Sequence, residues 1–88
     1  ELHELILALP GQQPQFALIQ YPNLPVPQPG EAVVILAVSD LEATIADVVS
    51  AGGRSLSQIY DLPQYDLKMA YVADPEGHTL ELTQKLSA

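Results

Sequence analysis

Few side chains in this 88-residue sequence can do chemistry, and the most informative of them lies close to its end. The stretch DPEGHTLEL, residues 74–82, places Glu81 in an alternating segment behind a turn-forming sequence. A carboxylate there can bind a metal, move a proton, or pair with Lys68 across a hairpin. We favour the ion pair with Lys68, because a single protein ligand holds a metal poorly.

The two histidines add little to a catalytic or metal-binding interpretation. His78 directly follows the turn, and strand alternation places it on the side opposite Glu81, so we expect a turn or surface residue. His3 lies near the start of the sequence, where a ligand role has little support. The sequence has no cysteine, which excludes disulfides and zinc–thiolate sites and fits a reducing, cytoplasmic location.

The amino-acid composition limits the kinds of partner that the protein can bind. The sequence has eleven acidic and three basic residues, which give a formal net charge of −8. This composition does not provide the basic surface that binds nucleic acid or an anionic membrane. The apolar runs are too short to span a bilayer. A hydrophobic fraction of 48% is typical of a globular chain, and we expect one domain over residues 1–88. Because the sequence opens at Glu1 without Met, we expect an upstream part to be missing.

The first third of the sequence predicts a β-hairpin and a connector. Two apolar segments, Leu2–Leu9 and Phe16–Tyr21, flank a turn rich in Gly, Pro and Gln. Residues 22–31 then contain four prolines, which favours a stiff, extended linker. The alternative is a polyproline ligand for another protein, but the segment lies between two strong strand signals.

Residues 32–84 predict a β-strand, a helix and three further strands. Ala32–Val38 is continuously apolar, as in a strand covered on both faces. Ser39 and Glu42 have the spacing of a capping box at a helix start, and Gly52–Gly53 favour a left-handed helix end. The remaining predicted strands are Arg54–Tyr60, which is weak, then Leu67–Ala73 and His78–Gln84, with a loop over residues 61–66.

The last two strands fix which residues share a face. Asp74, Pro75 and Gly77 occupy positions that these residues prefer in a type I turn. A simple four-residue hairpin would place Ala70 opposite Glu81, so that Lys68, Ala70 and Val72 share the face of Glu81. The opposite face, expected to pack under the helix, then contains Leu67, Met69, Tyr71, Leu80 and Leu82.

The segment VSDLEATIADVVSAGG followed by AYVADPEGHTLEL resembles the vicinal-oxygen-chelate superfamily, which includes glyoxalase I, bleomycin-resistance proteins and extradiol dioxygenases. The resemblance implies an α+β fold: a glyoxalase/bleomycin-resistance-like βαβββ module over residues 32–84, with an extra N-terminal β-hairpin over residues 1–21. That hairpin is similar to the last two strands of a preceding module. We therefore expect a chain truncated relative to the two-module family fold.

The resemblance also implies where a metal would bind. Two family modules form a cup that holds a divalent metal through histidine or glutamine and glutamate side chains. Glu81 matches the glutamate of the second module, whereas Val33 stands at its histidine position and Leu18 at the first module's glutamate position. Since aliphatic side chains cannot ligate a metal, we expect no cofactor. The alternative is Zn²⁺, Ni²⁺, Mn²⁺ or Fe²⁺ with Glu81 as a ligand.

Three functions follow from the resemblance. The first is metal-free, bleomycin-resistance-like binding of a small molecule in a cleft between modules. The second is a glyoxalase I-like lyase or an extradiol-type dioxygenase with Glu81 as the catalytic residue, and the third is an inactive scaffold. The incomplete first module also predicts a homodimer that builds the cleft from two chains, with or without exchanged hairpins. The expected ligand-binding residues are Phe16, Leu18, Val33, Ile35, Tyr60, Tyr65, Lys68, Ala70 and Val72, with Asp61 and Asp66 on the same loop as the tyrosines.

Overall fold

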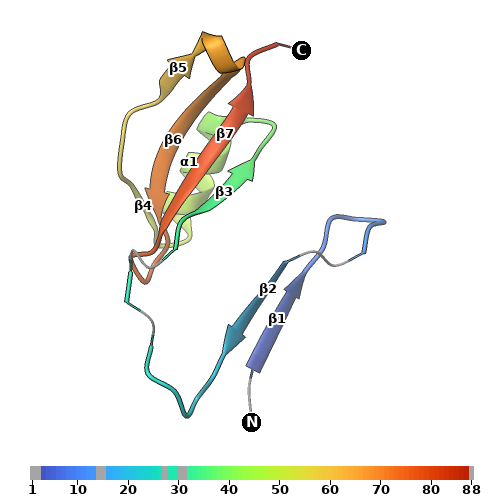
Figure 1. Cartoon of the computed structure of the whole chain (residues 1–88), viewed down its shortest axis with the longest axis vertical. Coiled ribbons are helices and arrows are strands. Elements are labelled where there is room, and N and C mark those ends of the chain that lie inside the picture. The colour runs from blue at the N-terminus through green and yellow to red at the C-terminus, as the bar shows by residue number, and fades with distance from the viewer. Residues whose placement is uncertain (1–2, 14–15, 27, 30–31, 88) are drawn as a thin grey trace.

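A computed structural model describes residues 3–13, 16–26, 28–29 and 32–87. Within these residues the chain is a mixed α+β protein with two separate sheets and one α-helix, as predicted (Figure 1). The first sheet is an N-terminal hairpin, and the second has five strands and belongs to the rest of the chain. No helix in the described part is long and apolar enough to cross a membrane.

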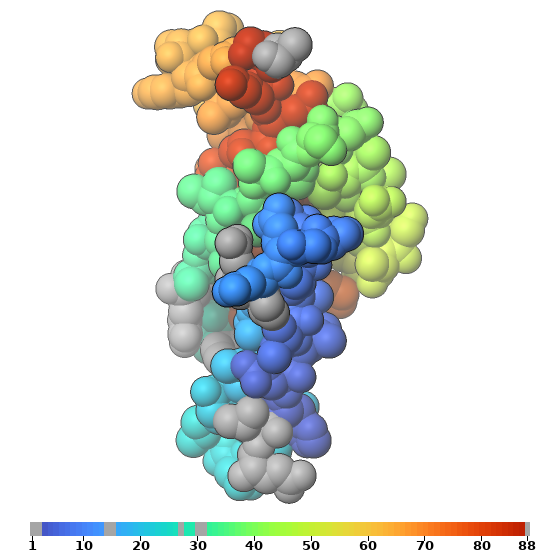
Figure 2. All heavy atoms as spheres, turned by 90° about the vertical axis from the view of Figure 1, so that its right-hand side faces the viewer, coloured from blue at the N-terminus to red at the C-terminus, as the bar shows by residue number. Residues whose placement is uncertain are grey.

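The N-terminal hairpin consists of β1 (His3–Leu7) and β2 (Phe16–Gln20), which pair antiparallel with Leu5 opposite Leu18. The predicted start at Leu2 lies outside the described residues, and β2 ends one residue earlier than expected. All residues of both strands are exposed. Figure 2 shows the hairpin, in blue, on the side of the molecule that faces the viewer.

The five-stranded sheet has the order β3-β7-β6-β4, with β5 pairing to β6 beyond this path. Strand β3 runs parallel to β7, and the other pairings are antiparallel. The helix α1 lies behind the sheet in Figure 1, and the face toward the viewer has no helix on it. The elements are β3 (Val34–Ala37), α1 (Leu41–Ser50), β4 (Arg54–Ser55), β5 (Tyr60–Leu62), η1 (Pro63–Tyr65), β6 (Leu67–Ala73) and β7 (Thr79–Lys85).

This order of elements contains the predicted βαβββ pattern, with two differences. The segment Arg54–Tyr60 is not one strand but two short ones, β4 and β5, and residues 63–65 form a 3₁₀ turn instead of a loop. Ser57 separates the two strands. Its hydroxyl oxygen accepts a hydrogen bond from the backbone N–H of Tyr71 at 3.0 Å, so a side chain takes the place of a backbone partner there.

The core lies between α1 and one face of the sheet. Leu41 from the helix packs with Ala70 and Val72 of β6 and with Leu82 of β7, and all four are almost completely buried. Three further side chains from the helix and β7 border this cluster: Ile45, Val48 and Leu80. Burial of a Leu or Val side chain stabilises a fold by roughly 1.5–3 kcal/mol, so this small cluster is the main source of stability.

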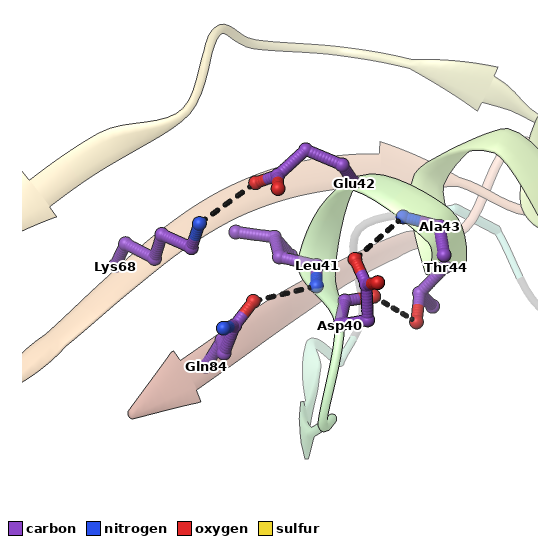
Figure 3. Close-up of polar contacts among 7 residues, drawn as sticks. All are labelled: Asp40, Leu41, Glu42, Ala43, Thr44, Lys68 and Gln84. Atoms are coloured by element: carbon purple, nitrogen blue, oxygen red, sulfur yellow. Dashed lines mark hydrogen bonds and ion pairs between the residues drawn. The ribbon is translucent and has the colours of Figure 1, made fainter. Parts of the chain in front are cut away.

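The helix start is fixed by three side chains (Figure 3). Asp40, not the predicted Ser39, is the N-cap, and its Oδ1 accepts a hydrogen bond from the N–H of Ala43 at 3.0 Å. Asp40 is a better N-cap than Ser39, because its carboxylate also interacts favourably with the positive end of the helix dipole. The N–H of Leu41 donates to Oε1 of Gln84 at 2.7 Å, which ties the helix start to β7.

Lys68 contributes the third contact at the helix start. Its Nζ lies 2.8 Å from Oε1 of Glu42, as the close-up shows (Figure 3). The hydrogen bond to Glu42 raises the pKa of Lys68 above its ordinary value. Lys68 therefore lies on the helix side of the sheet, and the predicted pair between Lys68 and Glu81 is wrong.

The turn between β6 and β7 decides the register of these strands. The predicted four-residue turn is present, since the N–H of Gly77 donates to the carbonyl of Asp74; Gly77 itself has a φ of +93°. The N–H of Asp74 also donates to the carbonyl of His78, so Gly77 forms a bulge that adds one residue to the loop. Ala70 consequently pairs with Leu82 and not, as predicted, with Glu81.

Candidate functional site

The face of the five-stranded sheet opposite α1, called the open face below, contains Glu81 near its centre. In the observed register Glu81 pairs with Tyr71 on β6 and with Ile35 on β3. Paired residues of neighbouring strands point to the same side of a sheet. Ile35, Glu81 and Tyr71 thus form one row across three strands.

A second row lies next to the first. Met69 pairs with Thr83 on one side and with Tyr60 of β5 on the other, so these three residues share the open face as well. Met69 is nearly buried, whereas Tyr60 and Tyr71 remain 42% and 36% exposed. The open face is thus a partly covered surface, and the accessible groups around its centre include two tyrosines, an aliphatic flank and one carboxylate.

The surroundings of Glu81 determine what chemistry it can do. Its side chain is half-buried, and among the described residues the two close ion pairs are Lys68–Glu42 and His78–Glu76, neither of which includes it. Nor does the described part of the chain contain a group of three or more His, Asp or Glu side chains placed to hold a metal. Glu81 therefore faces the open side as a carboxylate outside the described ion pairs, with Ile35 and Tyr71 as its cross-strand neighbours.

Three predicted site residues lie on the wrong face for this site. Ala70 and Val72 are completely buried beneath α1, and Lys68 pairs with Glu42 at the helix start. The cause is the extra residue in the loop: a register shift of one residue moves every side chain of a strand to the other face. These residues cannot contact a ligand bound beside Glu81.

The same shift moves three residues that the sequence interpretation had placed under the helix. Leu67, Met69 and Tyr71 lie on the open face, whereas Leu80 and Leu82 were correctly assigned to the helix side. One feature of the sequence could have predicted the observed register of β6 and β7. A glycine at the fourth position of a type I turn can take positive φ, which is typical of a bulged hairpin with one more residue in its loop.

The other predicted residues fall into two groups. Ile35 lies on the open face, and Val33 directly precedes β3; both are exposed. Phe16 and Leu18 are on β2, in the separate hairpin, so one chain does not bring them beside Glu81.

The loop residues do not form one cluster. Tyr60 lies in β5 on the open face, whereas Tyr65 lies at the end of η1 and is highly exposed. Asp61 pairs with Lys68 across β5 and β6, which places it on the helix side. Asp66 has a left-handed backbone, and its carboxylate accepts hydrogen bonds from the N–H and the hydroxyl of Ser87, so it holds the end of the chain.

The histidines take no part in this site. His78 closes the turn, where its N–H donates to Oδ1 of Asp74 and its ring lies 3.8 Å from the carboxylate of Glu76. His3 is exposed at the start of β1. The expectation that His78 is a turn residue is confirmed.

A hollow of about 730 Å³ lies elsewhere, between the hairpin, the proline-rich connector and the turn after β6. Its lining includes Leu18 and Tyr21 together with Asp74 and Glu76, but not Glu81 or Tyr71. The residues around it belong to exposed strands and to a connector without helix or strand in its described part. We regard the open face as the better candidate, because packed strands position its residues.

The sheet order, the single covering helix and the central glutamate on the last strand together define a module of the glyoxalase type. A family model described as "Glyoxalase-like domain" matches residues 3–83, and the chain belongs to this family. The match includes the N-terminal hairpin as well as the five-stranded sheet. No curated protein and no solved structure matches the chain.

Proposed function

We propose that this protein binds a small apolar or aromatic molecule, without a metal, on the open face of its five-stranded sheet. The row formed by Ile35, Glu81 and Tyr71 is the observation that supports this proposal. It offers an aliphatic wall, an aromatic ring and one polar group that can orient a ligand, which is the usual make-up of a small-molecule site. In function the protein then resembles the bleomycin-resistance type of its superfamily.

The described donor set does not fit the divalent metal of the wider superfamily. Glu81 has Ile35 and Tyr71 as its paired neighbours, and Val33, which stands where a histidine ligand is expected, is aliphatic. One carboxylate leaves most coordination positions of Zn²⁺ or Fe²⁺ without a protein ligand. We therefore derive no lyase or dioxygenase step for this chain, and the scaffold alternative remains as an outcome of the binding test.

A second copy of the chain is part of this proposal, because no helix of the described chain covers the open face (Figure 1). The hairpin has apolar residues on both faces, with Leu5, Leu7 and Leu18 on one side and Ile6 and Ile19 on the other. They are 44–58% exposed, and an isolated two-stranded hairpin is marginally stable in water. Strand β3 is a short apolar edge strand with its outer edge unpaired in the described sheet.

We propose that the hairpin of one copy covers part of the open face of the other. Residues 21–33 connect the two sheets, and an extended segment of that length spans roughly 40 Å. Such an arrangement brings Phe16 and Leu18 of one chain to Val33, Ile35 and Glu81 of the other, which is the cleft that the family resemblance implies. It forms a two-fold symmetric homodimer, the commonest kind of homo-oligomer.

Metal content and ligand binding test the first part of the proposal. Elemental analysis of the purified protein should find less than a stoichiometric amount of Zn, Ni, Mn or Fe. A thermal-shift screen of small aromatic compounds should then find ligands whose binding perturbs the amide NMR signals of residues 35, 71 and 81. One tightly bound metal per chain contradicts the metal-free proposal, and a screen without any ligand favours the scaffold.

Light scattering across a dilution series tests the assembly. We expect dimer mass at tens of micromolar and a shift toward monomer mass in the variant Leu5→Ser/Leu18→Ser. The control is Val49→Ser, which changes an exposed apolar residue on the helix. A wild-type protein that keeps monomer mass over the whole series refutes the homodimer and the closed cleft.

A further inference from the structure

We propose that the open-face site selects ligands that carry a positive charge, such as a quaternary ammonium or a protonated amine. This inference rests on the proposed small-molecule function and narrows it to one chemical class. It identifies Glu81 as the residue that recognises the charge and Tyr71 and Tyr60 as the aromatic walls beside it.

Glu81 and Tyr71 belong to the closer of the two kinds of antiparallel pair. The N–H of Tyr71 donates to Ser57 and its carbonyl accepts from Leu56, so both backbone groups point away from β7. Tyr71 and Glu81 are consequently a non-hydrogen-bonded pair, in which Cα atoms lie about 4.5 Å apart and side chains approach closely. A cation can contact the carboxylate of one and the ring of the other at the same time.

Tyr60 provides a second aromatic side chain within reach. It pairs with Met69, and Tyr71 follows two residues later on the same strand and the same face. Diagonal neighbours of this kind lie roughly 7–8 Å apart, a spacing that aromatic side chains can bridge. Nearly buried Met69 lies between the two tyrosines as an apolar floor.

The local charges favour a cation. No described side chain forms an ion pair with Glu81, although Arg54 and Lys85 also belong to strands of this sheet. Arg54 pairs with Ala73 and Lys85 with Leu67, so both lie toward the ends of the face, away from the row of Glu81. A half-buried carboxylate without a basic partner gains most from a ligand that brings the missing charge. The net charge of −8 adds long-range attraction for cations.

A matched pair of probes tests this choice. Phenyltrimethylammonium and its uncharged carbon isostere, tert-butylbenzene, have nearly the same shape and differ in charge. We expect NMR titration to give at least tenfold tighter binding of the ammonium compound at low salt, with the largest shifts at residues 60, 71 and 81. Glu81→Gln should remove most of this preference, and Tyr71→Leu should weaken ammonium binding several-fold.

Two controls separate charge recognition from general effects. Asp47→Asn removes one exposed carboxylate from the helix and should leave the preference unchanged. Tyr71→Phe keeps the ring and should keep most of the affinity. Equal binding of the two probes overturns the cation preference while leaving small-molecule binding intact. If neither probe binds, or if both shift only residues of the hairpin, the cation site and the open-face function are refuted together.

Discussion

The two sheets of this protein contain similar residues and yet differ in what holds them together. The five-stranded sheet packs Ala70, Val72 and Leu82 against Leu41 of the helix, and all four are almost completely buried. The hairpin is as apolar, with Leu5 and Leu18 paired across its strands, but all its strand residues are exposed. An apolar strand is buried only where a second layer covers it, and among the residues that the structure describes such a layer lies on the second sheet.

Family membership and burial give different information about the two sheets. Both sheets belong to the region that matches the glyoxalase-like family, so family membership does not distinguish the covered sheet from the uncovered one. Burial does. Substitutions at matched positions of the two sheets should thus change the free energy of unfolding by unequal amounts when the protein is dilute enough to be monomeric.

The largest difference should come from matched leucines. Leu82→Ala in β7 removes a core side chain, and we expect it to lower the free energy of unfolding by about 2–5 kcal/mol. Leu18→Ala in β2 should change it by less than about 0.5 kcal/mol in the monomer, since Leu18 is half exposed there. Urea unfolding followed by circular dichroism measures both. Equal losses would show that the hairpin packs as tightly as the core.

Glycines provide the next comparison. A Cβ at Gly53 would lie 2.4 Å from the carbonyl oxygen of Ala73 and 2.6 Å from Cγ1 of Val48. Gly53→Ala should therefore destabilise the five-stranded sheet by about 1–3 kcal/mol, because helix and sheet must move apart. Gly11→Ala in the hairpin loop meets no atom within 4 Å, and the strain of a side chain at its φ of +75° falls on the separate hairpin, so the main unfolding transition should stay in place. The same midpoint for both variants would contradict the close approach at Gly53.

A smaller effect is expected for matched glutamines. Gln84→Met keeps the size of the side chain but removes the oxygen that accepts from the N–H of buried Leu41. The loss should be about 1–2 kcal/mol, since a partly buried donor is left without a partner. Gln20→Met on the hairpin is the control and should stay within about 0.5 kcal/mol of wild type. Thermal unfolding by calorimetry can resolve this difference; a Gln84 variant as stable as the control would mean that water replaces the lost bond.

The smallest effect on stability should follow from removing residues 1–21 altogether. No strand of the hairpin hydrogen-bonds to the five-stranded sheet, so we expect a melting temperature within a few degrees of the full chain at low concentration. At high concentration the full chain should melt higher than the shortened one, because association stabilises the folded state by mass action. A shortened chain that fails to fold would show that the hairpin is part of the core.

The order of elements was predictable from the sequence because it depends on local signals. Strand β6 was predicted with its observed bounds, and the helix over Leu41–Ser50 follows from one apolar stripe and its terminal glycines. The βαβββ pattern and the family resemblance depend on these signals, and both are confirmed. Glu81 on the open face and Leu82 on the helix side were also predicted correctly, since alternation within one strand is a local property.

The composition of the site was not predictable in the same way, because it depends on the register between two strands. A single bulge residue, Gly77, moves Leu67, Met69 and Tyr71 to the open face and Lys68, Ala70 and Val72 to the helix side. The residue types of the turn are local, but the choice between a four-residue turn and a bulged loop is made by which face of β6 the helix can bury. Ala70 and Val72 are small enough to pack beneath Leu41, whereas the ring of Tyr71 is too large for this position. Tertiary packing therefore decided which residues lie beside Glu81.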